Sequence, residues 1–77
     1  MSIRESIEKA AELLGSQEAL GALFGLQKAA VSNWKRIDSV PVEYCARIEQ
    51  ATAGAVTRKD LRPDDWQAIW PELAEAA

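Results

Sequence analysis

The sequence has no histidine, and Cys45 is the only cysteine among its 77 residues. A single cysteine excludes an intrachain disulfide, and the two shortages together exclude a Cys/His zinc site and any catalytic pair in which histidine is the base. Most carboxylates lie at the spacing of a helix surface. Asp64 and Asp65 are better explained as first-turn residues favoured by a helix dipole than as an acid–base pair. We therefore expect no enzyme, no metal ion and no other cofactor.

Long apolar runs and linkers are also missing. No stretch approaches the length needed to span a bilayer, and residues 1–6 are charged where a secretion signal would be apolar. A chain this short can close one core but cannot also enclose a deep cavity. We expect a cytoplasmic protein with no membrane or small-molecule partner. It should have one domain over residues 1–70 and a frayed tail over residues 71–77.

The formal net charge of -3 is unfavourable for binding a polyanion, but the charge is unevenly distributed. Residues 28–62 hold seven basic and four acidic side chains, a net charge of +3. Residues 63–77 hold four acidic side chains and no basic one. A positive face on an acidic body is therefore expected.

Apolar residues recur at helical spacing along most of the chain. The pattern predicts helices over residues 2–14, 17–24, 27–36 and 41–53, then short helical turns at 57–60 and 63–70. Ser16 suits an N-cap, Pro41 suits a first helical position, and Gly54 suits a helix end. Few β-branched residues follow position 55, which favours helices over a C-terminal hairpin. The prediction is a compact all-α fold of five helices, within a range of four to six.

Residues 17–36 form two short predicted helices around one glycine. Gly25 can adopt the positive φ of a sharp turn between helices. Gly21 is unusual because glycine inside a helix costs about 0.5 to 1 kcal/mol relative to alanine, and we expect a close helix crossing there. The apolar residues of the motif should form a wedge that fixes the angle between the helices. These wedge residues are Leu20, Phe24, Leu26, Val31 and Trp34.

This pattern resembles the helix-turn-helix of the phage Cro and CI repressor superfamily. The run from Ala29 to Arg36, then Val40-Pro41, and the segment from Ala55 to Trp66 are similar to small all-helical Cro proteins and the related YdaS-like regulators. The similarity extends over about residues 8 to 73. It implies a lambda-repressor-like DNA-binding domain. The implied function is a phage or prophage repressor in the cytoplasm of a bacterial host, acting on a double-stranded DNA operator.

In such a fold the N-terminal part of the second motif helix lies nearest the base edges in the major groove. The residues expected to read bases are Gln27, Lys28, Ala29, Ser32 and Asn33. Residues at the helix ends are better placed to bind phosphates without specifying sequence. The expected phosphate-binding residues are Ser16, Gln17, Lys35, Arg36 and Arg47.

One recognition helix covers only a half-site, so tight specific binding predicts a homodimer on a roughly palindromic operator, formed either free or only on DNA. Trp66, Ile69 and Trp70, together with Tyr44, are candidates for its surface, although they fit a core equally well. The alternative function is a helical protein-interaction module, such as a prophage toxin or antitoxin component. The acidic net charge favours this alternative slightly, and the basic helix at 27–36 disfavours it.

Overall fold

The computed structural model describes residues 2–76, without the side chains of residues 74–76, and this part of the chain is all-helical. Its helices are α1 (Ile3–Leu14), α2 (Gln17–Ala22), α3 (Lys28–Ile37), α4 (Val42–Ala51), α5 (Arg58–Leu61), α6 (Trp66–Ile69) and α7 (Pro71–Ala76). The all-α helix-turn-helix fold is confirmed. The described residues hold seven helices rather than the predicted five, because the C-terminal segment divides into three short helices, α5, α6 and α7, with non-helical backbone at Arg62 and at Trp70 between them.

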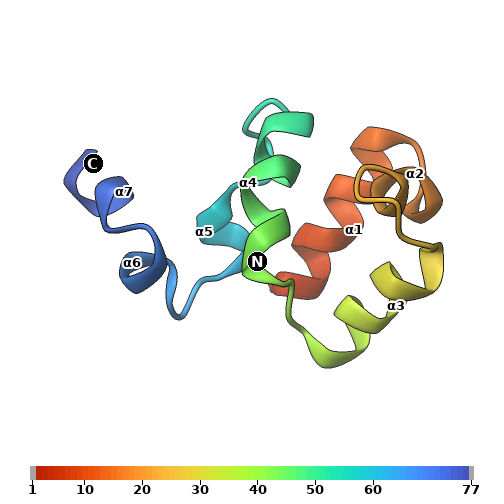
Figure 1. Ribbon diagram of the computed structural model, residues 1–77, viewed down its shortest axis with the longest axis horizontal. Helices are drawn as coiled ribbons and strands as arrows, with labels where there is room; N and C mark the ends of the chain where they lie inside the picture. Colours follow the sequence, from red (N-terminus) through yellow and green to blue (C-terminus); the bar gives the residue numbers. More distant parts are fainter. Residues whose placement is uncertain (1, 77) are drawn as a thin grey trace.

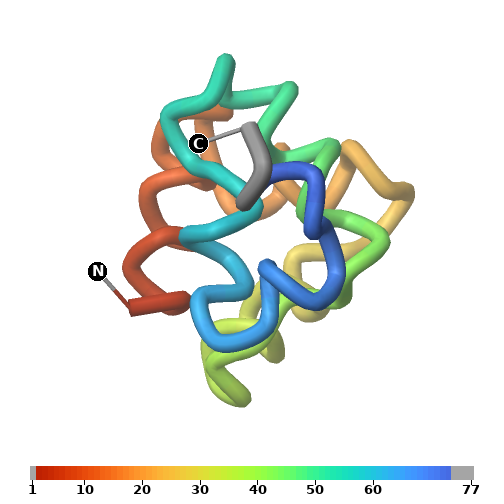
Figure 2. Tube along the Cα trace, turned by 90° about the vertical axis from the view of Figure 1, so that its left-hand side faces the viewer, coloured from red at the N-terminus to blue at the C-terminus, as the bar shows by residue number. Residues whose placement is uncertain are grey.

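The core lies among α1 to α5, and α6 and α7 extend from the end of the molecule opposite α2 and α3 (Figure 1). Seen along the long axis, α6 and α7 lie in front of the other helices (Figure 2). Eleven hydrophobic side chains form the buried core: Ile7, Ala10, Ala11, Leu20, Val31, Trp34, Val40, Cys45, Ile48, Val56 and Leu61. Every one of the first five helices contributes to it. These helices therefore hold α3 in a fixed place.

Several helix boundaries differ from the predicted ones. The helix predicted over residues 17–24 ends at Ala22, because the chain turns at residues 23–25 to reach α3. Pro41 is the N-cap of α4 rather than its first residue. Ser16 caps α2 as expected, since its hydroxyl accepts a hydrogen bond from the Ala19 amide at 3.0 Å. Pro71 begins α7, and Ala77 lies outside the described residues, so the expected tail stays a prediction.

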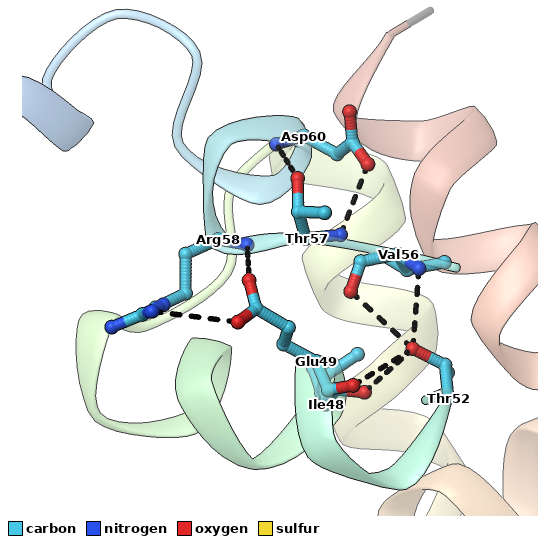
Figure 3. Close-up of polar contacts among 7 residues, drawn as sticks. All are labelled: Ile48, Glu49, Thr52, Val56, Thr57, Arg58 and Asp60. Atoms are coloured by element: carbon cyan, nitrogen blue, oxygen red, sulfur yellow. Dashed lines mark hydrogen bonds and ion pairs between the residues drawn. The ribbon is translucent and has the colours of Figure 1, made fainter. Parts of the chain in front are cut away.

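The junction between α4 and α5 is closed by side-chain hydrogen bonds (Figure 3). The buried Thr52 hydroxyl bonds to the Ile48 carbonyl at 2.9 Å and accepts from the Val56 amide at 3.2 Å. Thr57 and Asp60 form a capping box at the start of α5. These bonds satisfy backbone groups that the short loop leaves without helical partners. They fix α5 against the end of α4.

Arg62 joins the C-terminal segment to the loop between α3 and α4. Its guanidinium donates to the Asp65 carboxylate at 2.6 and 3.1 Å and to the Val40 carbonyl at 3.0 Å. Asp64 and Asp65 were expected in the first turn of a helix, but α6 begins at Trp66, and the Asp65 carboxylate binds Arg62 and makes no capping hydrogen bond. The hydrogen bond from Arg62 lowers the pKa of Asp65, and the same bond raises the pKa of Arg62.

Two features of the structure concern nucleophilic catalysis and membrane insertion. Cys45 is fully buried, and burial raises the pKa of its thiol to about 11, so it is a packing residue rather than a nucleophile. Among the described residues, no helix combines the length and the apolar character that crossing a membrane requires.

Candidate nucleic-acid interface

An apolar wedge sets the orientation of α3. Leu20 and Val31 are fully buried, and Trp34 is 4% exposed. Phe24 and Leu26 pack against them from the turn, and the Phe24 ring meets the Trp34 ring edge-on at 6.2 Å between centroids. Because these side chains fill the space between the two helices, α3 cannot rotate about its axis without opening a void.

Two glycines make the short turn possible for different reasons. Gly25 has a φ of +69°, a region that L side chains rarely adopt. A Cβ atom on Gly21 would lie 2.8 Å from the carbonyl oxygen of Leu26 and 3.3 Å from that of Gln27. The neighbour that requires glycine at position 21 is therefore the backbone leading into α3, and not a crossing helix.

The outer face of α3 is polar. All of the side chains expected to read bases are exposed: Gln27, Lys28, Ala29, Ser32 and Asn33. Gln27 is the N-cap of α3, but its side chain makes no capping hydrogen bond. Lys28 forms no ion pair with any described residue. This face can therefore present its donors and acceptors to a partner outside the chain.

Hydrogen bonds connect the start of α2 to the outer face of α3. The Gln17 amide donates to the Ser32 hydroxyl at 3.0 Å and accepts a hydrogen bond from the Lys35 ammonium group. Gln17 and Lys35, both expected to bind phosphates, are thus hydrogen-bonded to each other. Gln17 also bonds to Ser32, which was expected to read a base. Lys35 is held beside the N-terminus of α2, where backbone amides also favour an anion.

A second hydrogen bond lies further along α3. The Arg36 guanidinium donates to the Asn33 side-chain oxygen. A bidentate pair between Asn33 and adenine uses that oxygen together with the amide nitrogen. Asn33 therefore has to share its oxygen with Arg36, or to release it, when it reads a base.

The surroundings of α3 differ in charge between its two ends. A hollow of about 490 Å³ beside its C-terminal half is lined by Arg4, Ser32, Lys35 and Arg36. Another, of about 540 Å³, lies at its N-terminal end and includes Glu18, Lys28 and Gln27 in its lining. The excess of positive charge is therefore at the C-terminal half.

A protein-family model described as "Bacterial toxin YdaS" matches residues 7–69, a range that includes the wedge, both motif glycines and all of α3. The chain belongs to the YdaS family. It is 40% identical over 66 residues to the "Putative transcriptional regulator YdaS" of Escherichia coli (strain K12). The match covers 83% of this chain and 67% of that protein.

This YdaS-family chain is also similar to a solved structure, described as "Structure of the Cro protein from putative prophage element Xfaso 1 in Xylella fastidiosa strain Ann-1". The two chains are 46% identical, with a TM-score of 0.72, over 77% of this chain and 91% of the other. The Cro and YdaS-like resemblance read from the sequence is therefore confirmed.

The residues considered for a dimer surface lie in two places in this YdaS-family chain. Tyr44 is half-buried, and its ring lies 4.4 Å from that of Phe24 and 5.5 Å from that of Trp34. Trp66, Ile69 and Trp70 are half-buried on and just after α6. Tyr44 thus extends the aromatic wedge, whereas the other three belong to the C-terminal segment.

Among the remaining candidates of this YdaS-family chain, Ser16 and Arg47 are exposed, at the N-cap of α2 and on α4. Arg4 was not predicted to be part of the site. It is one of two cations on α1, far from the motif in sequence, and no local pattern distinguishes it from the other, Lys9. Only the packing of α1 against α3 brings Arg4 beside Ser32, Lys35 and Arg36.

Proposed function

We propose that this chain is a sequence-specific DNA-binding regulator of Cro type, a repressor that occupies an operator through the exposed face of residues 27–36. No cofactor is needed for this function. The proposed setting is the cytoplasm of a bacterial host. The relatives are named as a regulator and a Cro protein and not as enzymes, which supports a role without catalysis.

The observation that carries this proposal is the polar outer face of α3 on a helix whose inner face is locked. Five exposed side chains of suitable chemistry follow one another along a helix that packing holds rigid. Among the described residues, neither Lys28 nor Lys35 nor Arg36 has a carboxylate partner. Their charge is thus available to neutralise phosphates despite the acidic net charge.

The proposed roles divide along α3. Gln27 and Asn33 suit adenine, Lys28 suits guanine, and the Ala29 methyl suits the methyl group of thymine, each good pair contributing about 1 to 3 kcal/mol of discrimination. Ser32 reads a neighbouring base edge. The phosphate contacts come from Lys35 and Arg36 with Ser16, Gln17 and Arg47.

A homodimer on a roughly palindromic operator completes the proposal, because one recognition helix covers one half-site. A dimer that assembles on the DNA itself satisfies the same geometry. Trp66, Ile69 and Trp70 are the proposed contact between the two copies, together with the half-buried Tyr44. The partial exposure of all four side chains supports this choice.

The second candidate is a protein-interaction module of the toxin or antitoxin type. The description of the matching family model favours it. So do two large apolar side chains that remain half exposed, Leu13 at 54% and Ile37 at 51%. A surface that binds a protein usually centres on aromatic anchors, and the outer face of α3 has none.

The deciding experiment is selection of bound duplexes from a randomised pool at about 0.1 M salt, where non-specific contacts are already screened. We expect a palindrome with half-site centres about ten base pairs apart. A double variant, Lys28→Ala with Asn33→Ala, should lose that preference, whereas Lys35→Gln should weaken binding to all sequences alike. If no consensus is recovered from the unmodified chain, the protein-interaction module becomes the better proposal.

A further inference from the structure

The hollow beside α3 brings together three cations from two helices. Arg4 of α1 and Lys35 and Arg36 of α3 line it, and the fourth lining residue, Ser32, is uncharged. Like charges that line one hollow repel one another, and salt at about 0.1 M screens such repulsion only beyond about 10 Å. An anion between them replaces repulsion with attraction, so the hollow suits a bound anion.

The backbone of Arg4 is fixed relative to α3. Its amide donates a hydrogen bond to the Asp38 carboxylate at 3.0 Å, and Asp38 is the C-cap of α3. The Ser2 hydroxyl caps the same turn of α1 by accepting from the Glu5 amide at 3.1 Å. The start of α1 is therefore tied to the end of the recognition helix, and only the Arg4 side chain has to move to reach a ligand.

The Arg4 side chain is available for such a contact. It is 66% exposed, and its ion pair with Glu8 has an Nε–Oε1 distance of 3.4 Å at a site where Glu8 is itself 50% exposed. Exposed pairs of this kind are weak. A guanidinium has five N–H donors, so Arg4 can turn its Nη groups to a phosphate at little cost.

We propose that Arg4 binds a phosphate of the DNA backbone next to the one contacted by Lys35, and that α1 thereby takes part in the interface. This inference rests on the DNA-binding function proposed above. The anion is assigned to DNA because Ser32, which lines the same hollow, lies on the face that enters the major groove in that proposal. Arg4 then positions the C-terminal half of α3 without reading sequence.

The test compares Arg4→Gln with Lys9→Gln, which removes the same charge from another exposed position of the same helix. Binding to a mixed-sequence duplex of about 30 base pairs, which spans two half-sites with flanks, is measured from about 0.05 to 0.2 M salt. For Arg4→Gln we expect the slope of log K against log salt to become shallower by about 0.9 per chain. Affinity at about 0.1 M salt should fall about eightfold per chain. Lys9→Gln should leave the slope unchanged.

A second pair of variants tests the competition with Glu8. Glu8→Gln removes the carboxylate that pairs with Arg4, whereas Glu12→Gln removes a carboxylate from another position of α1. Glu8→Gln should therefore increase the affinity for DNA more than Glu12→Gln does. Circular dichroism checks that all four variants keep their helices. Equal slopes for Arg4→Gln and Lys9→Gln would overturn the role of Arg4 while leaving DNA binding intact. Failure of the unmodified chain to bind the duplex at the lowest salt would overturn the proposed function and this inference together.

Discussion

The helix-turn-helix, residues 17–37, and the C-terminal arm, residues 66–76, both carry apolar side chains at helical spacing, but the fold covers them to different degrees. In the helix-turn-helix, Leu20 and Val31 are fully buried and Trp34 is 4% exposed. In the arm, α6 has no buried residue, and its tryptophans are half-exposed. The arm lies at one end of the molecule, where few other helices can cover it (Figure 1).

Different forces therefore hold the two regions. Burial of apolar area stabilises the helix-turn-helix. The arm combines partial burial, with Trp70 packed against the core, and two cation–π contacts: the Lys59 ammonium lies 4.5 Å from the centroid of the Trp66 ring and the Arg58 guanidinium 5.5 Å from that of Trp70. An apolar stripe in the sequence therefore indicates which face of a helix tends to be buried. How far that face is buried depends on the helices that pack next to it.

The largest expected difference between the regions is in the cost of removing a tryptophan. Trp34→Ala should lower the free energy of unfolding by about 3 to 5 kcal/mol, because it empties a filled site between α2 and α3. Trp70→Ala should cost about 1 to 2 kcal/mol, since that ring is already partly in water. Urea unfolding followed by circular dichroism measures both. Equal losses would mean that the arm is as well packed as the motif.

A smaller effect is expected inside the helix-turn-helix, at its two glycines. Gly21→Ala should cost about 2 to 3 kcal/mol despite the better helix propensity of alanine, because the new Cβ meets backbone 2.8 Å away. Gly25→Ala should cost about 1 to 2 kcal/mol, from the positive φ alone. Thermal unfolding of the two variants provides the comparison. A neutral Gly21→Ala would show that the turn can move away, and α3 would then be less rigid than its packing indicates.

The sequence predicted the helix-turn-helix well because its signals are local. Ser16 at an N-cap, Gly25 at a positive φ and apolar side chains three and four apart each constrain the backbone within one or two turns. The same signals overestimated the length of the helix that starts at Gln17. Its apolar pattern continues through Phe24, but the chain turns at residues 23–25, where Gly25 adopts a positive φ.

The parts that could not be predicted depend on residues distant in sequence. Gln17 bonds to Ser32 and Lys35 only after the two helices have crossed. Arg62 binds Asp65 and the Val40 carbonyl together, although the sequence offered only a helix-dipole role for the carboxylate. The helix at 28–37 ends at Asp38, which has a φ of +54°. Glycine is the residue that usually marks such a helix end in a sequence, and here the position is aspartate. The DNA-contact roles stay predictions, since they concern a partner outside the chain.

A modest effect is expected from the cation that covers the arm. Lys59→Gln should lower the free energy of unfolding by about 0.5 to 1 kcal/mol, because the Trp66 ring loses the charge lying on its face. Lys59→Arg keeps a cation at the same place and should retain most of the stability. Urea unfolding at low salt compares the two. If both variants lose the same amount, the ammonium contributes nothing through the ring, and the arm is held by its apolar contacts alone.

The smallest expected effect concerns the ion pair at the base of the arm, and it depends on pH. Because the hydrogen bond from Arg62 lowers the pKa of Asp65 in the folded chain, the pair contributes fully above the unfolded pKa of about 3.9. That contribution is lost as the pH falls through the lower folded value. Asp65→Asn should therefore unfold at a lower temperature than the unmodified chain at about pH 7. The difference in unfolding temperature should shrink as the pH falls below about 4. Asp64→Asn, at the exposed neighbouring position, should match the unmodified chain throughout. A difference that persists undiminished at about pH 2 would assign the effect of Asp65→Asn to local packing instead of charge.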